Sequence, residues 1–415
     1  MRRKVLVPIF NRAHYGRLRP VLLAIKNHTA LELQIIVAVP AAYKNFFGNL
    51  KNSRPHSWLL SLPWYIRARL IGFLGSNKIL KNDFLASKLL DDGFNINGFV
   101  PMFIDGGVSD TMAKSVGLGI PLIVEEIKRL KPDIVFVNAD RFEMMGVALA
   151  ASYMNVPIAH NEGGDVSGTL DESIRHSITK LSHVHFTSTE SSRRRVIQMG
   201  ENPERVFAVG SPAIDAVKNL DLQIRKNIFT GLDISKPFLL TLLHPVATSS
   251  SKENSLMANN LIKVLKDLKM QTVLLGSNTD AGSDEVGKAI RSWISTENPD
   301  YVFFTKHLHP DDFYRYLNAS VCAIGNSSSF IREGAYFGTP VVLIGSRQNK
   351  RERAENILEC DENCENIKSS IEKQIKVGRF NKSLLFGNGE ASNHVSGILS
   401  RINLDVQKSF KDYDA

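Results

Sequence analysis

Short apolar runs alternate with amphipathic stretches along most of the 415-residue chain. Apolar runs bounded by turn residues predict buried strands at 4–9, 33–39 and 134–137, and the stretches between them carry apolar residues at helical spacing. The same rhythm restarts near residue 237 and includes a further apolar run at 321–324. Strands that alternate with helices pair in parallel, so the pattern predicts an α/β protein with two alternating β/α domains.

Acidic side chains follow two neighbouring strands of the first predicted domain. Asp140 ends the strand that contains 134–137, and Glu162 follows the next short strand, in the glycine-rich loop of AHNEGGDVSGTLDESIRHSITKLS. Asp171 falls in the first turn of the helix after this loop, and Arg175 lies one turn later on the same face. Because the carboxyl ends of parallel strands meet at one edge of a sheet, we expect these acids to share one crevice.

A single acid near a helix start is most often a cap. Three acids that converge on a glycine-rich crevice are harder to explain in that way, because acids held close together in a partly dry cleft acquire displaced pKa values. Displaced pKa values of this kind are what proton abstraction and return require. We therefore interpret Asp140, Glu162 and Asp171 as a catalytic cluster.

The second predicted domain places ligand-type residues at two strand ends. His244 ends its first strand, and the run at 321–324 leads into a serine-rich turn with Ser327 and Ser328. Hydroxyls and backbone N–H groups at a helix start form a preformed anion cradle, although plain capping explains such serines equally well. Glu333 follows one helical turn further, where its carboxylate can accept hydrogen bonds from ribose hydroxyls.

Arginines near these turns are candidate partners for a diphosphate. Arg12 lies at the junction between the first strand and the next helix, where backbone N–H groups and a cation can meet a phosphate. Arg347, Arg351 and Arg353 follow the strand VVLIG in the second domain. Two domains that face one another would hold a nucleotide diphosphate in the second domain and present its other end to the acids of the first.

Composition narrows the class of protein. The chain is 43% hydrophobic and 22% charged, which is typical of a soluble globular protein, and its length favours two domains with a polar linker region near 216–236. Its net charge of +9 suggests an anionic ligand, but the basic residues are spread along the chain and form no nucleic-acid-binding motif. We therefore expect no nucleic acid partner.

Cysteine content and hydropathy indicate the cellular compartment of the protein. The three cysteines are an odd, sparse set that argues for a reducing compartment and against a disulfide framework, and we expect no metal site. The apolar run at the start is too short for a signal peptide, and no run of about eighteen apolar residues occurs. These observations predict a cytoplasmic protein without a membrane span.

Several segments together resemble one enzyme family. They are NADRFEMM, HNEGGDVSGTLDESIRHSITKLSHVHF, RVFAVGSPAID, LLHPV, IGNSSSFIREGAYFGTPVVLIGSRQNKRERAENI and FGNGEASNHV, and the match covers most of residues 1–40 and 80–400. The combination is similar to the hydrolysing UDP-N-acetylglucosamine 2-epimerases of bacterial sialic-acid-type sugar pathways. The resemblance implies two Rossmann-like domains of the GT-B type, at 1–215 and 216–390, and a helix within 391–415 that returns to the first domain.

The resemblance also implies a reaction and its residues. UDP leaves by anti elimination to give a 2-acetamidoglucal, and water then adds to give free N-acetylmannosamine for nonulosonic acid or surface polysaccharide synthesis. No cofactor is implied, and we expect a homo-oligomer, either a dimer or a tetramer. The resemblance assigns catalytic roles to Asp140, Glu162, Asp171 and His244, and nucleotide binding to Arg12, Ser327, Ser328 and Glu333.

Positions at which the sequence departs from the family pattern affect the predicted sugar specificity more than the predicted type of reaction. His14 stands where the family usually has Asp, and Asn161 stands where Ile or Val is common. Related enzymes act on a 2,4-diacetamido-6-deoxy sugar, and some use a GDP-linked sugar, so both substrates stay open. A glycosyltransferase of the same fold and a sugar-nucleotide-binding regulator are the alternative classes, since fold does not fix function.

Residues 44–79 match nothing in the family and form an insertion relative to it. The segment contains Trp58 and Trp64 among several leucines and arginines. We interpret it as a helical lid packed on its own domain, with a basic amphipathic element on a membrane or partner surface as the alternative.

Deletion of residues 44–79 is expected to leave a soluble protein that still turns over its substrate, because the segment lies outside every predicted strand end. Release of UDP from a UDP-linked substrate measures the turnover, and circular dichroism monitors the fold. Loss of turnover with an intact fold would contradict this expectation and would favour the glycosyltransferase.

Overall fold

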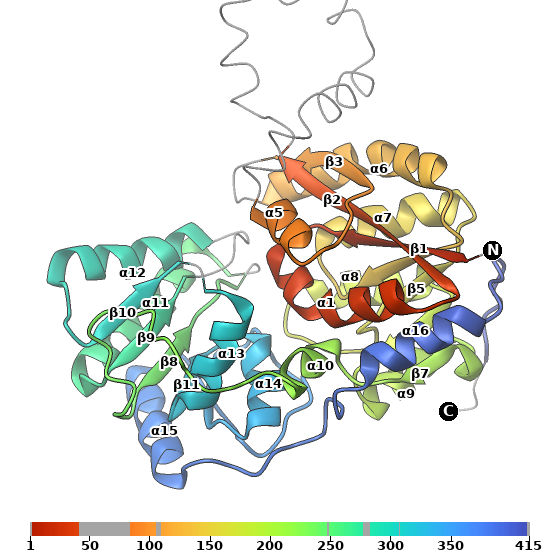
Figure 1. Ribbon diagram of the computed structural model, residues 1–415. Coiled ribbons are helices and arrows are strands. Elements are labelled where there is room, and N and C mark those ends of the chain that lie inside the picture. Colours follow the sequence, from red (N-terminus) through yellow and green to blue (C-terminus); the bar gives the residue numbers. More distant parts are fainter. Residues whose placement is uncertain are drawn as a thin grey trace, which may run out of the picture.

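The computed structural model contains two parallel β-sheets, each covered by helices on both faces (Figure 1). It describes residues 2–40, 84–104, 109–246, 249–276, 283–306 and 308–412. The insertion at 44–79 lies outside these residues. The two-sheet α/β architecture predicted from the sequence is confirmed.

The first sheet has the strand order β3-β2-β1-β4-β5-β6-β7. Its strands are β1 (Arg3–Ile9), β2 (Leu31–Pro40), β3 (Gly98–Phe103), β4 (Ile134–Asn138), β5 (Ile158–Asn161), β6 (Val184–Thr187) and β7 (Val206–Ala208). The helices between them are α1 (Arg12–Asn27), α5 (Phe84–Asp91), α6 (Ser109–Leu130), α7 (Phe142–Tyr153), α8 (Asp171–Leu181) and α9 (Glu190–Gln198), with the short η2 (Pro203–Arg205). The strand order reverses between β1 and β4, and ligands bind outside the carboxyl ends of strands at such a point.

The second sheet has the order β10-β9-β8-β11-β12-β13, which reverses between β8 and β11. Its strands are β8 (Leu239–Leu242), β9 (Thr272–Leu275), β10 (Val302–Thr305), β11 (Cys322–Gly325), β12 (Val341–Ile344) and β13 (Ile357–Cys360). The helices are α10 (Pro212–Lys218), α11 (Ser251–Leu268), α12 (Ser283–Glu297), α13 (Pro310–Ala319), α14 (Ser328–Phe337), α15 (Cys364–Val377) and α16 (Ala391–Arg401). We call β1–β7 with their connecting helices the first unit, and β8–β13 with theirs the second unit.

The strands form because their side chains are apolar on both faces of the sheet. In β1, Val5 and Val7 belong to one buried cluster and Leu6 to the cluster on the opposite face. The predicted strand at 134–137 behaves in the same way, since Phe136 faces the first cluster and Val135 the second. A strand of a parallel sheet is buried on both faces, so its sequence is a continuous apolar run and does not alternate.

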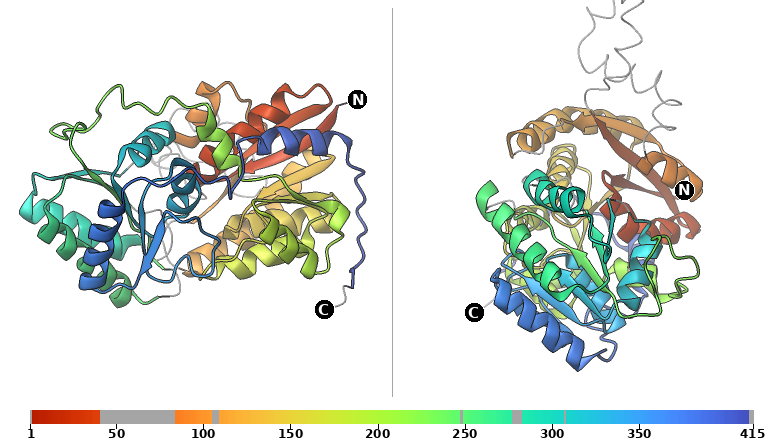
Figure 2. Two further views of the ribbon diagram at one scale, coloured as in Figure 1. Left: turned by 90° about the horizontal axis from the view of Figure 1, so that it is seen from below. Right: turned by 90° about the vertical axis from the view of Figure 1, so that its left-hand side faces the viewer.

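The last helix, α16, leaves the second unit and packs on the first. Its residues Val395 and Leu399 are fully buried in the same cluster as Leu18 and Leu22 of α1. The chain crosses between the two units just before α16 and then continues along the first unit (Figures 1 and 2). The returning helix expected from the family resemblance is therefore present.

Two boundaries are set by local contacts. Helix α1 begins at Arg12, because the Asn11 side chain caps it by accepting a hydrogen bond from the His14 backbone N–H at 2.8 Å. The boundary expected at residue 215 falls inside α10, which packs Ile214 and Val217 into a core of the second unit. Within the described ranges, every helix is too short or too polar to span a bilayer.

Replacement of Leu399 by Ala should destabilise the protein. Leu399 is completely buried between α16 and α1, so the truncation leaves a cavity that typically costs about 2–5 kcal/mol of unfolding free energy. Urea denaturation measures the loss. The exposed His394 of the same helix is the control, and His394→Ala should change the unfolding free energy by less than about 0.5 kcal/mol. Equal stability of the two variants would show that α16 is not integral to the first unit.

Candidate functional site

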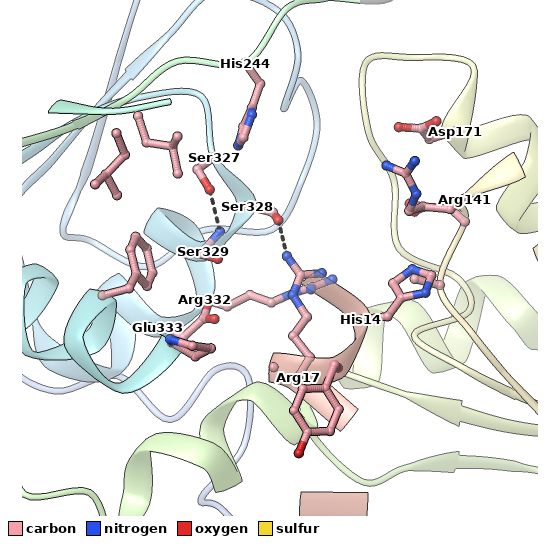
Figure 3. A pocket seen from close by; sticks show the side chains of 18 of the residues that line it. His14, Arg17, Arg141, Asp171, His244, Ser327, Ser328, Ser329, Arg332 and Glu333 are labelled. Carbon is pink, nitrogen blue, oxygen red and sulfur yellow. Dashed lines mark hydrogen bonds between the residues drawn. The ribbon is translucent and has the colours of Figure 1, made fainter. Parts of the chain in front are cut away.

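A cavity of about 590 Å³ lies between the two units, at the carboxyl ends of both sets of strands. Its wall includes α1 and the turns after β4 and β5 from the first unit, and the turns after β8 and β11 from the second (Figure 3). The turn after β12 also contributes to it. A volume in this range suits a ligand of nucleotide-sugar size. Among the described residues, no group of His, Cys, Asp or Glu side chains is arranged to hold a metal ion.

Most of the site residues predicted from the sequence line this one cavity. They are Asp140, Glu162, Asp171, Arg175, His244, Ser327, Ser328, Glu333, Arg347 and Arg351. Arg353 does not line it, because its guanidinium pairs with the Glu359 carboxylate and donates to the Gln348 carbonyl at 3.2 Å. Arg12 begins α1, but its side chain lies outside the described part of the structure.

Two non-glycine residues with left-handed backbone shape the acidic side of the cavity. Ala139 has φ 59° at the end of β4, and Glu162 has φ 62° at the end of β5. Such conformations cost free energy and persist where the surrounding structure enforces them, often at functional sites. Here they turn Asp140 and Glu162 out of the sheet and towards the cavity.

A buried histidine fixes this turn. His160 approaches the Ala139 carbonyl through Nε2 at 2.8 Å and the Thr179 hydroxyl through Nδ1 at 3.1 Å. Burial lowers the pKa of His160 to about 3, so the ring is neutral near pH 7. Because a carbonyl only accepts, Nε2 carries the proton and Nδ1 accepts from the threonine hydroxyl.

The acids are held in a network of ion pairs that joins the two units. Arg175 is buried, pairs with the Asp140 carboxylate, and donates to the Asp165 carbonyl at 2.6 Å. Arg332 of α14 contacts the Glu162 carboxylate at 3.0 Å and the Asp165 carboxylate at 2.7 Å. The first of these arginines lies in the first unit and the second in the second unit, so the network spans the cavity wall.

The network keeps Asp140 and Asp165 ionised. Burial acts to raise the pKa of Asp140, but the charges of Arg175 and Arg351 outweigh it and hold that pKa well below its usual range. The pKa of Asp165 is lowered in the same way, since Arg332 and Arg351 offset its burial. Asp140 is therefore a poor proton acceptor but a strong fixed negative charge.

The second unit contributes a serine turn at the start of α14. Ser327 is the N-cap and accepts a hydrogen bond from the Ser329 backbone N–H at 3.3 Å, so this serine does have the capping role considered for it. The Ser328 hydroxyl accepts from Arg17 of α1 at 2.7 Å, across the two units. Asn326 holds the His244 backbone through two hydrogen bonds of 2.8 Å, so the histidine faces the same turn.

Glu333 is a buried carboxylate that lines the cavity. Only 1% of its surface is exposed, and its Oε2 has no hydrogen-bond partner among the described residues. Burial raises the pKa of this carboxyl above its usual value. A buried polar atom without a partner is costly, so the geometry is suited to a ligand hydroxyl that donates to it.

Sequence reasoning missed four residues of the site. Arg17, Arg332 and Asp165 belong to the charge network, and His14 lines the cavity. His14 is buried with its Nδ1 unpaired within the described residues, and burial lowers its pKa to about 4. The one indication of His14 in the sequence is that it differs from the Asp usual in the family at this position. The other three residues can be recognised only when distant segments of the chain are brought together.

Comparison with known proteins identifies similar chains. A family model described as UDP-N-acetylglucosamine 2-epimerase matches residues 81–400. The chain is 34% identical over 319 residues to the hydrolysing UDP-N,N'-diacetylbacillosamine 2-epimerase of Legionella pneumophila, with 76% of this chain and 83% of that protein covered. It is 30% identical over 318 residues to the hydrolysing GDP/UDP-N,N'-diacetylbacillosamine 2-epimerase of Campylobacter jejuni, with 72% and 82% covered.

A third relative matches nearly the whole chain. The UDP-N-acetylglucosamine 2-epimerase of Neisseria meningitidis is 25% identical over 421 residues, with 99% of each protein covered. Among solved structures, the UDP-GlcNAc 2-epimerase from Neisseria meningitidis bound to UDP-GlcNAc superposes with a TM-score of 0.72 at 18% identity, covering 95% of this chain and 99% of that one. This structural likeness supports the fold.

Replacement of Glu333 by Ala is expected to weaken UDP binding by about tenfold or more, because a lost hydrogen bond to a charged group costs about 1.5–3 kcal/mol. Isothermal titration calorimetry with UDP measures the affinity. Glu372→Ala, at an exposed position on α15, is the matched control. UDP affinity that is equal in the two variants would remove Glu333 from the nucleotide site.

Proposed function

Because the chain belongs to the UDP-N-acetylglucosamine 2-epimerase family, we propose that it is a hydrolysing 2-epimerase that releases UDP from a UDP-linked 2-acetamido sugar. One observation carries the proposal. Acids from two neighbouring strand ends of the first unit and the serine turn of the second unit line the same cavity. A nucleotide held at the serine turn therefore presents its sugar to Asp140, Glu162 and Asp171.

The first step is an elimination. A carboxylate takes the proton from C2 of the sugar, the C2–H electrons form the C1–C2 double bond, and the C1–O bond to UDP breaks with its electron pair leaving on the diphosphate. The products are a 2-acetamidoglucal and UDP. The C2 proton is weakly acidic, so its removal requires a carboxylate held close to it and stabilisation of the departing charge.

The second step adds water across the double bond. The water oxygen bonds to C1, and a proton is delivered to C2 on the face opposite to the one it left. The sugar is released with inverted configuration at C2, and UDP leaves as the second product. The elimination and the addition of water together return the sugar to its original oxidation level, so the two steps are redox-neutral and consume no cofactor.

The charges around each acid indicate how the catalytic roles are divided among the site residues. Asp140 pairs with Arg175 and has a lowered pKa, so we assign it to fixing charge and orientation in the site. Glu162 and Asp171 then carry the two proton transfers. His244 is held beside the serine turn and is assigned to orient or protonate the leaving phosphate. Ser327, Ser328, Glu333, Arg12 and Arg347 hold the nucleotide.

The relatives guide the choice of sugar. The two that are 34% and 30% identical carry names that specify N,N'-diacetylbacillosamine, and the one that is 25% identical specifies N-acetylglucosamine. We therefore propose a UDP-linked 2,4-diacetamido sugar as the first substrate to test and UDP-N-acetylglucosamine as the second, with GDP-linked sugar as the alternative nucleotide. The manno-configured product would serve nonulosonic acid or surface polysaccharide synthesis in the cytoplasm, by a homo-oligomeric enzyme.

Reaction in heavy water should place solvent deuterium at C2 of the released sugar, because water supplies the proton in the second step. Reaction in ¹⁸O-labelled water should place the label at C1. Mass spectrometry and NMR of the product from either UDP-sugar, incubated without an acceptor, detect both labels. A product that keeps its original C2 hydrogen would rule out epimerisation by proton transfer, and turnover only with an added acceptor would indicate a glycosyltransferase.

Amide substitutions test the acids one at a time. Glu162→Gln and Asp171→Asn keep size and hydrogen bonding but cannot take a proton, so each should lower kcat by about 100-fold or more. Asp140→Asn should also lower kcat strongly, because it leaves the Arg175 charge unpaired in the site. UDP affinity serves as the internal control for an intact nucleotide site. Full activity in any of the three variants would exclude that residue from the mechanism.

A further inference from the structure

Arg332 reaches from one unit into the other. It lies on α14 in the second unit, only 2% of it is exposed, and its guanidinium faces the first unit (Figure 3). One nitrogen, Nη1, contacts the Glu162 carboxylate at 3.0 Å, and the other, Nη2, donates to Asp165 at 2.7 Å. A planar guanidinium is suited to this because its two nitrogens have a fixed separation and orientation.

The two oxygens of Glu162 have different surroundings. Oε1 is contacted by Arg332 at 3.0 Å and accepts a hydrogen bond from the buried Ser211 hydroxyl at 3.1 Å. Oε2 has no hydrogen-bond partner among the described residues, and its ion-pair contact is with Arg17 at the longer distance of 3.8 Å. Oε1 is therefore held by two groups, whereas Oε2 is left without a hydrogen bond among the described residues.

Asp165, the second carboxylate that Arg332 contacts, is itself held in place by other side chains. Asp165 accepts from the Ser192 hydroxyl at 2.8 Å, and Arg351 approaches the same carboxylate at 3.7 Å. Asp165 thus fixes the direction of the guanidinium, and the guanidinium fixes Glu162. Such a chain of contacts restrains the rotamer of the acid without occupying its second oxygen.

The position of Arg332 in the sequence connects this anchor to the nucleotide site. It directly precedes Glu333 and lies one helical turn after Ser328, on the same short helix. A helix moves as a unit, so a shift of α14 would move the serine turn, Glu333 and Arg332 together. The position of Glu162 therefore depends on the element that holds the nucleotide.

We propose that Arg332 is a positioning residue for Glu162, which anchors one carboxylate oxygen so that the other faces the reacting sugar, and which ties this geometry to the nucleotide-binding helix. The inference rests on the proposed function, in which Glu162 transfers a proton. Arg332 acts through Glu162 and takes no proton itself.

Kinetics of Arg332 variants test the proposal on the full chain with the UDP-sugar that the wild type turns over. Arg332→Gln should lower kcat by about 50-fold or more, while KM and the affinity for UDP change by less than about threefold. Arg332→Lys keeps the charge but lacks the fork that spans two carboxylates, so it should recover only part of the loss, to within about tenfold of the wild type. It also keeps the buried acids paired with a cation, which protects folding.

Two further variants separate positioning from a general loosening of the structure. Glu352 accepts a hydrogen bond from the Thr189 hydroxyl across the two units and does not line the cavity, so Glu352→Gln should retain kcat within about twofold. If Arg332 acts through Glu162, adding Arg332→Gln to Glu162→Gln should lower kcat by less than about threefold more. A structural role would lower both backgrounds equally.

The outcomes are distinct. An inactive wild type would contradict the proposed function itself. An active wild type whose Arg332→Gln and Arg332→Lys variants both keep kcat within twofold would overturn only the role of Arg332. So would a further loss in the Glu162→Gln background as large as that in the wild type, or an equal loss in Glu352→Gln.

Discussion

The buried charge network between the two units is the interaction on which the rest of the site depends. Taking a carboxylate or a guanidinium out of water costs several kcal/mol unless an oppositely charged, hydrogen-bonded partner is present. Glu162 and Asp165 come from the first unit, and Arg332, which pairs with both, comes from the second. Because Arg332 pairs with acids of the other unit, these contacts favour the arrangement in which the two units enclose the cavity.

The backbone that carries this network depends on glycine at two close approaches. Gly164 has φ 77°, and a Cβ there would lie 2.2 Å from the Ser192 carbonyl oxygen. A Cβ on Gly168 would lie 2.1 Å from the Ser346 carbonyl oxygen of the second unit. The glycine-rich loop after β5 therefore packs against its own unit at one end and against the other unit at the other. This packing sets the path of the chain between Glu162 and Asp171.

The sequence was sufficient to predict the features that depend on local pattern, namely the strands and the residues at their ends. Apolar runs located β1, β2, β4 and β11 to within two residues, and the position of Asp140 and Glu162 after successive strands predicted that both would face one cavity. It was insufficient for contacts between distant segments. Arg332 is 167 positions from Asp165, and its sequence context predicts only a buried helix. The sequence pattern also does not distinguish Arg347, which lines the cavity, from Arg353, which pairs with Glu359.

The charges around the cavity point to an anionic ligand more directly than the net charge of the chain does. Burial, together with repulsion from Arg332, lowers the pKa of Arg351 to about 9. The loss of water around this buried guanidinium is the larger cause, and the charges of Arg332 and Arg175 add repulsion. A diphosphate in the cavity would offset this repulsion, and in the proposed reaction the same cations would stabilise the charge that develops on UDP as the C1–O bond breaks. Under the proposed function, the arginines that pair with the acids thus also create the potential that favours departure of the diphosphate.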